Sequence, residues 1–94
     1  MLDREGRLTI GLELLARCQE ISISTDVNMF YDNKNKCLVI TPKHRKIIGG
    51  MCFVASLKID EKGRIVMPSP VRKAFPDDYY LPTEKDDEIY IFII

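Results

Sequence analysis

The chain contains one short sequence twice, first from residue 3 and again 57 residues later from residue 60. Residues 3–10 read Asp-Arg-Glu-Gly-Arg-Leu-Thr-Ile, and residues 60–67 read Asp-Glu-Lys-Gly-Arg-Ile-Val-Met. Each copy has an aspartate, two charged residues, a glycine and an arginine, followed by residues suited to a β-strand. Each copy is followed by about seven residues that could form a short helix, at 12–18 and at 69–75. Such a repeat predicts two copies of one small structural unit.

The length of the chain indicates how these two units are organised. Ninety-four residues suffice for one domain. Half of that length buries too little surface to be stable alone, so we expect the two copies to build one core together. We therefore predict a single domain over residues 1–94, with a first unit at 2–40, a connection at 41–50 and a second unit at 51–94.

Composition is that of a folded protein, with 46% hydrophobic and 30% charged residues. No apolar run approaches the roughly 18 residues that span a bilayer, and the charged start of the chain predicts no signal peptide. The cysteines are Cys18, Cys37 and Cys52, an odd number without metal-ligand spacing. We expect reduced, mostly buried thiols in a cytoplasmic protein with no metal and no cofactor.

Charge is distributed unevenly along the chain, although the formal net charge is zero. Residues 42–75 hold eight Lys or Arg and two acids, which gives +6, whereas residues 76–94 hold six acids and one Lys, which gives −5. Such asymmetry is typical of a surface for anionic partners. The alternative is a charged face that only contacts solvent.

The pattern of apolar residues and turn signals predicts short strands and two short helices. Residues 51–59 are apolar at positions of both parities, which predicts a strand buried on much of both faces. Ser69 is expected to cap the second helix, with Pro70 at its first position, and Pro76 to end it. Other strands are predicted at 7–10, 27–31, 36–40 (after a turn at 32–35), 64–67 and, as the last strand, 89–94.

The last six residues, 89–94, are uncharged and would favour aggregation on an open sheet edge. We therefore expect this strand to be paired or covered, with Ile89, Ile91 and Ile93 or their opposite-face neighbours buried. The second unit then has an opening strand, a turn, a helix and one late strand, so it lacks a final strand.

Residues 58–73 resemble the unit of the AbrB/MazE/SpoVT superfamily of swapped-hairpin transcription factors. The resemblance rests on a strand, the turn Asp60-Glu61-Lys62-Gly63-Arg64, a return strand, Pro68 and a short basic helix. The tandem copies are similar to the MraZ branch of that superfamily, and together they cover most of the chain. The resemblance implies a mainly β fold with short helices (α+β), a swapped-hairpin β-barrel built from two tandem units. Two chains as a homodimer, or one chain as a pseudo-dimer, would supply the units.

The resemblance also implies a transcriptional regulator that binds duplex DNA through the Gly-Arg turn and the helix start. An arginine guanidinium suits phosphates and guanine edges by bidentate hydrogen bonds. The positions that match the family's DNA contacts are Arg7, Lys58, Arg64, Arg72 and Lys73. The positions that match its turn are Asp3, Gly6, Asp60 and Gly63.

The first copy departs from the family pattern at its helix. Leu15 and Ala16 replace the basic pair, and Gly11 replaces the proline. Half of a symmetric DNA surface would be degraded, which favours the alternative of a protein-interaction or antitoxin-like module with a toxin-like partner. An enzyme is not predicted, because the chain has one His, no Gly-rich phosphate loop and no nucleophile in a recognisable setting.

Structural roles compete with the proposed contacts. The Asp-Arg pairs could simply tie tight turns, and Arg72 and Lys73 could be a solvated helix face. Residues 43–46 form a second basic cluster that suits either a solvated connection or auxiliary phosphate contacts. Tyr79 and Tyr80 are expected to pack rather than to stack on bases.

Overall fold

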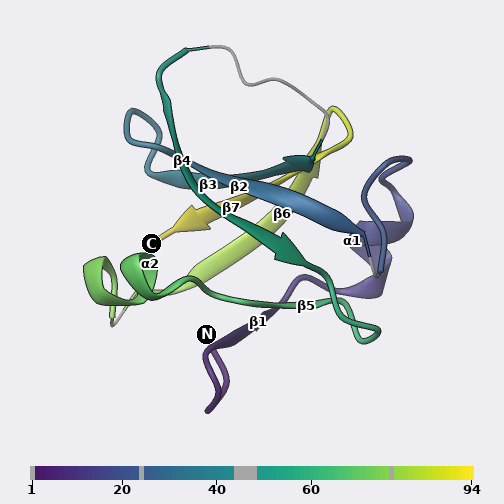
Figure 1. The fold of residues 1–94 in the computed structure, drawn as a ribbon, viewed down its shortest axis with the longest axis horizontal. Helices are drawn as coiled ribbons and strands as arrows, with labels where there is room; N and C mark the ends of the chain where they lie inside the picture. Colours follow the sequence, from purple (N-terminus) through teal and green to yellow (C-terminus); the bar gives the residue numbers. More distant parts are fainter. Residues whose placement is uncertain (1, 24, 44–48, 77) are drawn as a thin grey trace.

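Two antiparallel sheets with two short helices beside them make up the computed structural model of the chain (Figure 1). The structure describes residues 2–23, 25–43, 49–76 and 78–94. One sheet has five strands in the order β4-β2-β3-β7-β6, and the other pairs β1 with β5. The elements are β1 (Arg7–Thr9), α1 (Leu12–Ala16), β2 (Asp26–Asp32), β3 (Cys37–Pro42), β4 (Met51–Lys58), β5 (Arg64–Val66), α2 (Ser69–Ala74), β6 (Tyr80–Lys85) and β7 (Glu88–Ile93). The expectation of a mainly β fold with short helices is confirmed.

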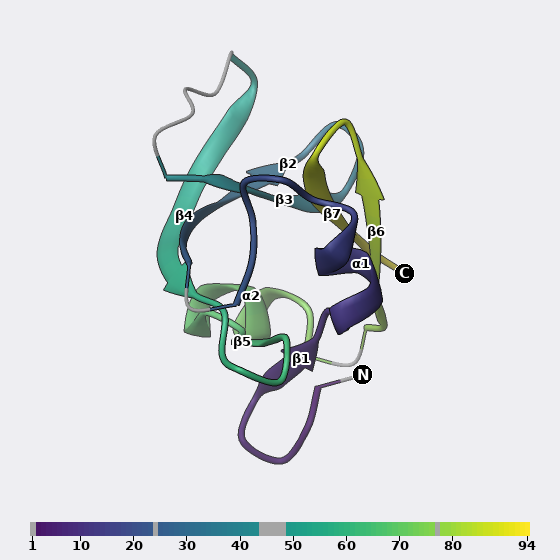
Figure 2. The ribbon, with the colours of Figure 1, turned by 90° about the vertical axis from the view of Figure 1, so that its right-hand side faces the viewer.

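The five-stranded sheet curves over the core, and the β1–β5 ribbon lies across its open side (Figure 2). In Figure 1, α1 and α2 lie on either side of this ribbon. Among the described residues, each strand pairing lies within one of the two sheets, and β4 and β6 are the edges of the larger one. Strand pairing therefore leaves the sheets open rather than closed into a barrel. The radius of gyration is 12.0 Å, close to the ~12 Å expected for a compact chain of this length.

The first hairpin follows its prediction closely. Asp32 ends β2, and its Oδ1 accepts hydrogen bonds from the backbone N–H groups of Lys34 (3.0 Å) and Asn35 (3.3 Å). Its Oδ2 accepts a third bond from Asn35 Nδ2 at 2.7 Å. These bonds fix the predicted turn. Strand β3 continues to Pro42, two residues past the predicted end, so Thr41 and Pro42 belong to the sheet rather than to the connection.

The second unit contains a complete hairpin, and the prediction of a single late strand is wrong. Strand β6 pairs with β7 from Tyr80↔Ile93 to Lys85↔Glu88. Strand β6 is not predicted from the sequence because it contains Pro82, which argues against a central strand. A proline is tolerated on an edge strand, and β6 is an edge strand. Asp86 and Asp87 form the turn with φ angles of 54° and 67°, a conformation usually signalled by Asn-Gly or Asp-Gly.

Strand β4 is the other correction. The sequence predicts a strand buried on much of both faces, but β4 is an edge strand without a buried residue. Its Phe53 side chain is 59% exposed, and Cys52 is exposed as well. The apolar composition of β4 therefore does not reflect burial within this chain.

The second helix begins differently from its prediction. Pro68 is the N-cap of α2 and Ser69 is its first helical residue, so no side chain caps the helix. A proline at this boundary suits a helix start because it has no N–H to satisfy. Among the helices of the described ranges, none is long and apolar enough to cross a membrane.

One hydrophobic core draws on both units. The buried residues of the two motifs, such as Leu8 and Ile65, pack in the same cluster as the strands of the large sheet. The prediction for the last strand is confirmed, since Ile89 and Ile91 are fully buried and Ile93 is 5% exposed. Strand β7 is protected because it lies between β3 and β6.

The cysteines separate into two buried residues and one exposed residue. Cys18 and Cys37 are buried and Cys52 on β4 is exposed, which agrees with the expectation of mostly buried thiols. Burial, together with the nearby Asp87 and Glu84 carboxylates, raises the pKa of Cys18 to about 11. Burial also raises the pKa of Cys37. Because the thiolate is the reactive form, both buried thiols should be inert at neutral pH.

We therefore expect the native protein, at low micromolar concentration, to react rapidly with a thiol-specific chromophoric disulfide at one cysteine only. Cys52→Ser should abolish this rapid phase, whereas Cys18→Ser should leave it unchanged. Unfolding in guanidinium should expose all thiols. Two or more rapidly reacting thiols in the folded protein would contradict the burial of Cys18 and Cys37.

Candidate nucleic-acid interface

The β1–β5 ribbon brings the two copies of the motif together. Leu8 lies opposite Ile65, and Thr9 lies opposite Arg64. Leu8 and Ile65 are buried and face the core. Because side chains alternate along a strand, Arg7 and Arg64 both lie on the outer face of the ribbon. Two motif arginines that are 57 residues apart in the chain thus share one exposed surface.

Each motif arginine is fixed by the aspartate that opens its turn. Asp60 Oδ1 accepts hydrogen bonds from the backbone N–H groups of Lys62 (2.9 Å) and Arg64 (2.8 Å). Asp60 Oδ2 accepts one from Arg64 Nε at 2.8 Å. In the first copy, Asp3 accepts the equivalent bonds from Arg7 N and Arg7 Nε, both at 2.8 Å. The repeated sequence is therefore a repeated structure, in which Asp and Arg tie the turn.

These hydrogen bonds shift the acidity of both aspartates. The backbone hydrogen bond from Arg7 is the main reason that the pKa of Asp3 lies below its usual value of 3.8. Burial alone would raise the pKa of Asp60, but hydrogen bonds from Arg64 and Lys62 outweigh it and lower the pKa overall. Both carboxylates are therefore charged in the folded turn at neutral pH.

Reciprocal hydrogen bonds join each turn to the other copy. The backbone N–H of Ile10 donates to the carbonyl of Gly63 at 2.8 Å, and that of Met67 donates to the carbonyl of Gly6 at 2.8 Å. Gly6 and Gly63 have φ angles of 78° and 74°, which glycine adopts without strain. The two donors, Ile10 and Met67, are 57 positions apart, and so are the two acceptors, Gly6 and Gly63. A pseudo-two-fold arrangement of the two copies requires this spacing.

The helices cross over to the opposite copy. A Cβ atom on Gly6 would lie 2.8 Å from Arg72 Nη1, and one on Gly63 would lie 3.3 Å from the side chains of Leu12 and Leu15. Arg72 is the residue equivalent to Leu15 in the repeat. The structure thus places Arg72 against the first-copy turn, whereas the sequence grouped it with Arg64 of the second copy.

The two motif arginines differ in which side chains contact their guanidinium groups. Arg7 Nη2 forms an ion pair with Glu5 at 3.0 Å. The position equivalent to Glu5 is Lys62, and within the described residues the Arg64 side chain bonds to Asp60 alone. The Arg64 side chain is 23% exposed and that of Arg7 is 28% exposed, so both present an edge to solvent.

The basic residues that match the family pattern do not all lie together. Arg72 and Lys73 are both exposed on α2, and Arg72 lies at the first-copy turn. Lys58 lies at the end of β4, where Nζ is 3.8 Å from Asp26 Oδ1 in an exposed ion pair. Acids and bases are equal in number within the two turns, 3–7 and 60–64. The excess positive charge near the ribbon therefore comes from α2.

The remaining basic and aromatic candidates contribute less. Lys43 is exposed, and its carbonyl accepts a 3.4 Å hydrogen bond from Asn28 Nδ2. The other members of the 43–46 cluster lie outside the described residues. Tyr80 packs as expected, buried with its hydroxyl donating to the Phe75 carbonyl at 2.8 Å. Tyr79 is 61% exposed, which contradicts the packing expectation for that residue.

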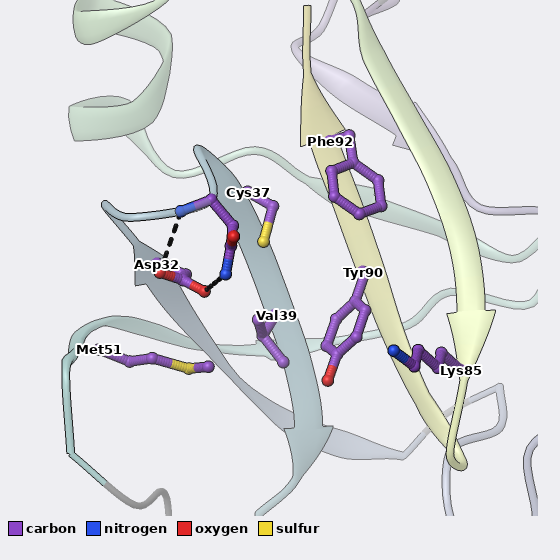
Figure 3. Close-up of a pocket in the computed structure, with 8 residues that line it drawn as sticks. Asp32, Cys37, Val39, Met51, Lys85, Tyr90 and Phe92 are labelled. Carbon is purple, nitrogen blue, oxygen red and sulfur yellow. Dashed lines mark hydrogen bonds between the residues drawn. The ribbon is translucent and has the colours of Figure 1, made fainter.

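Sequence reasoning did not anticipate a hollow of about 360 Å³ on the outer face of the five-stranded sheet (Figure 3). Phe92 and Tyr90 of β7 lie beside Cys37 and Val39 of β3, and Lys85 extends toward Tyr90 from β6 (Figure 3). The lining residues are Asp32, Asn35, Cys37, Val39, Met51, Lys85, Tyr90 and Phe92. The Asp32 carboxylate is already engaged by its turn. Within the described ranges, no group of His, Cys, Asp or Glu side chains could hold a metal ion.

No family model matches the chain, and neither a curated protein nor a solved structure matches it.

Substitution of the turn glycines tests the reciprocal arrangement. Gly63→Ala should destabilise the protein by about 1–2 kcal/mol, since an alanine is strained at positive φ. Its methyl group would also press on Leu12 and Leu15 of the other copy. Gly6→Ala carries the same backbone strain but meets the flexible end of Arg72, so it should cost no more than Gly63→Ala. Urea unfolding of both variants measures this order, and a neutral Gly63→Ala would contradict the observed turn.

Acid should weaken the turns in a defined pH range. Because the pKa of each aspartate is lowered on folding, its contribution to stability is present above the ordinary value of 3.8 and is lost as pH falls through the lower folded value. Melting temperature should therefore fall between pH 4 and pH 2 less steeply in an Asp3→Asn/Asp60→Asn double variant than in the wild type. Glu61→Gln is the control, since its side chain takes no part in the turn hydrogen bonds described above, and it should retain the wild-type slope.

Proposed function

We propose that this protein is a DNA-binding transcriptional regulator of the AbrB/MazE/SpoVT type that contacts duplex DNA through the outer face of the β1–β5 ribbon. The observation that carries the proposal is the register of the ribbon, which brings Arg7 and Arg64 onto one exposed face. A two-stranded β-ribbon fits the major groove of B-DNA. Arginines held at fixed positions can bond to phosphates or to guanine edges with little further loss of side-chain freedom.

The distribution of charge supports the same surface. Arg72 and Lys73 extend the ribbon face with positive charge from α2. The acidic β6–β7 turn, with Asp86 and Asp87, lies at the opposite end of the molecule from the ribbon in both views (Figures 1 and 2). A phosphate backbone against the ribbon would therefore approach the basic side and avoid the acidic one.

The two copies occupy pseudo-equivalent places on the ribbon, as two chains would in a swapped-hairpin barrel closed by a homodimer. The DNA surface is thus a composite, with Arg7 and Arg72 in one half and Arg64 and Lys62 in the other. The half with Arg7 and Arg72 combines residues of both copies, and this is why a single copy would not form the surface.

Salt dependence of DNA binding tests the proposal. A protein that neutralises Z phosphates loses affinity with salt at a log–log slope of about −0.9Z, so about four engaged basic residues give a slope of roughly −3 to −4 per chain. Arg72→Ala/Lys73→Ala should flatten this slope by about two units. Fluorescence anisotropy with a labelled duplex at 25 to 200 mM salt measures both values.

A matched control removes the same charge elsewhere. Lys34→Ala/Lys85→Ala takes two exposed lysines from the turn after β2 and the end of β6, and it should leave the slope within about half a unit of wild type. Absence of salt-dependent binding by the wild-type protein at low ionic strength would overturn the regulator proposal.

The alternative is a protein-interaction or antitoxin-like module with weakened DNA binding. It is favoured by the balanced charge of the two turns and by the exposed apolar side chains on the outer face of the large sheet. Phe53, Leu81 and Phe92 on that face are 59%, 54% and 37% exposed. A chain that fails the salt experiment but binds a protein partner through this face would fit the alternative.

A further inference from the structure

The two edges of the five-stranded sheet differ in how they are protected. Strand β6 carries Pro82, Glu84 and Lys85, which are residues that discourage a further strand from pairing. Strand β4 has no proline and no charge until Lys58, its last residue. Because β4 is an edge strand of eight residues, alternate residues along it direct unpaired backbone N–H and C=O groups away from the sheet.

The composition of β4 conflicts with its exposure. Apolar residues at positions of both parities are typical of a strand that is buried on both faces. In this chain β4 has no buried residue, and Phe53 is exposed although its ring packs edge-on against Phe30 at 5.6 Å. The pairing with β2 shifts by one residue between Phe53 and Ala55, which sharpens the twist of β4 but adds no charge or proline to its edge.

An apolar hollow lies beside the same strand. It has a volume of about 210 Å³ and separates β4 from α2. Its lining residues are Tyr31, Val54, Pro70, Val71, Ala74 and Phe75. Val54 belongs to β4 itself, so a strand added at this edge would lie next to the hollow and could place a side chain in it.

We propose that β4 is a self-association edge, through which two copies of the chain pair antiparallel about a two-fold axis. The unpaired backbone groups call for another β-strand as the occupant. A second β4 is suited to this role because antiparallel pairing keeps the two Lys58 charges at opposite ends of the pair, roughly 24 Å apart over seven residues. A parallel arrangement would place these like charges together. The pairing joins two five-stranded sheets into one continuous sheet.

The expected interface is small. Two eight-residue strands exchange about eight backbone hydrogen bonds, and the buried area falls near the lower end for specific complexes. The dimer should therefore dissociate in the micromolar range. This proposal does not depend on DNA binding, because the β4 edge and the outer face of the β1–β5 ribbon are different surfaces.

Sedimentation velocity at about 5 to 500 µM tests the proposal, with a monomer–dimer equilibrium as the expected result. Phe53→Lys places a charge on the β4 edge and should weaken the dimer at least about tenfold. Leu81→Lys is the matched control, because Leu81 has similar exposure on the opposite edge of the same sheet, and it should leave the dissociation constant unchanged. A monomer at all concentrations, or equal effects of the two variants, would overturn the proposal.

Hydrogen exchange of the wild-type protein gives a readout that does not rely on a variant's folding. Amide exchange in residues 51–58 should slow as protein concentration rises, whereas exchange in residues 80–85 should not change. Equal protection at both edges, or a change confined to β6, would assign the association to another surface.

Discussion

The structure depends on two backbone hydrogen bonds that run in opposite directions between the copies. Ile10 donates to Gly63 and Met67 donates to Gly6, and these bonds hold the β1–β5 ribbon in register. The register directs Leu8 and Ile65 inward and the two motif arginines outward. The same turns provide the surfaces on which the crossing helices pack. Removing either glycine carbonyl from its place would disturb the core, the arginines and a helix together.

The repeat was the most reliable guide in the sequence because local chemistry determines each turn. An aspartate that accepts bonds from residues two and four positions later, and a glycine at positive φ, need no information from the rest of the chain. For the same reason the turn at Asp32 and the strands around it followed the pattern closely. The crossing of the helices was not predictable, since Arg72 lies against Gly6 only because the two copies pair in space.

The two errors in strand prediction have one origin. Strand β6 was not predicted because Pro82 and the Asp86-Asp87 turn lack the usual strand and hairpin signals. Strand β4 was predicted as a central strand because of its apolar residues. Both are edge strands, where local preference and position in the sheet disagree most. Sequence pattern reports which residues suit burial but does not report which strand lies at the edge. The candidate site shows the same limit, because the sequence pattern groups Arg72 with Arg64, whereas the structure places Arg72 against Gly6 of the other copy.

The ribbon also constrains how the chain can reach its folded state. Residues paired across β1 and β5 lie more than 50 positions apart, and closing a loop of that length costs about 3–4 kcal/mol of chain entropy before any contact forms. The first motif therefore gains its partner only after the second has become available. We therefore expect the core to form cooperatively from both copies rather than by independent folding of each half, so that the repeated chain folds as one unit.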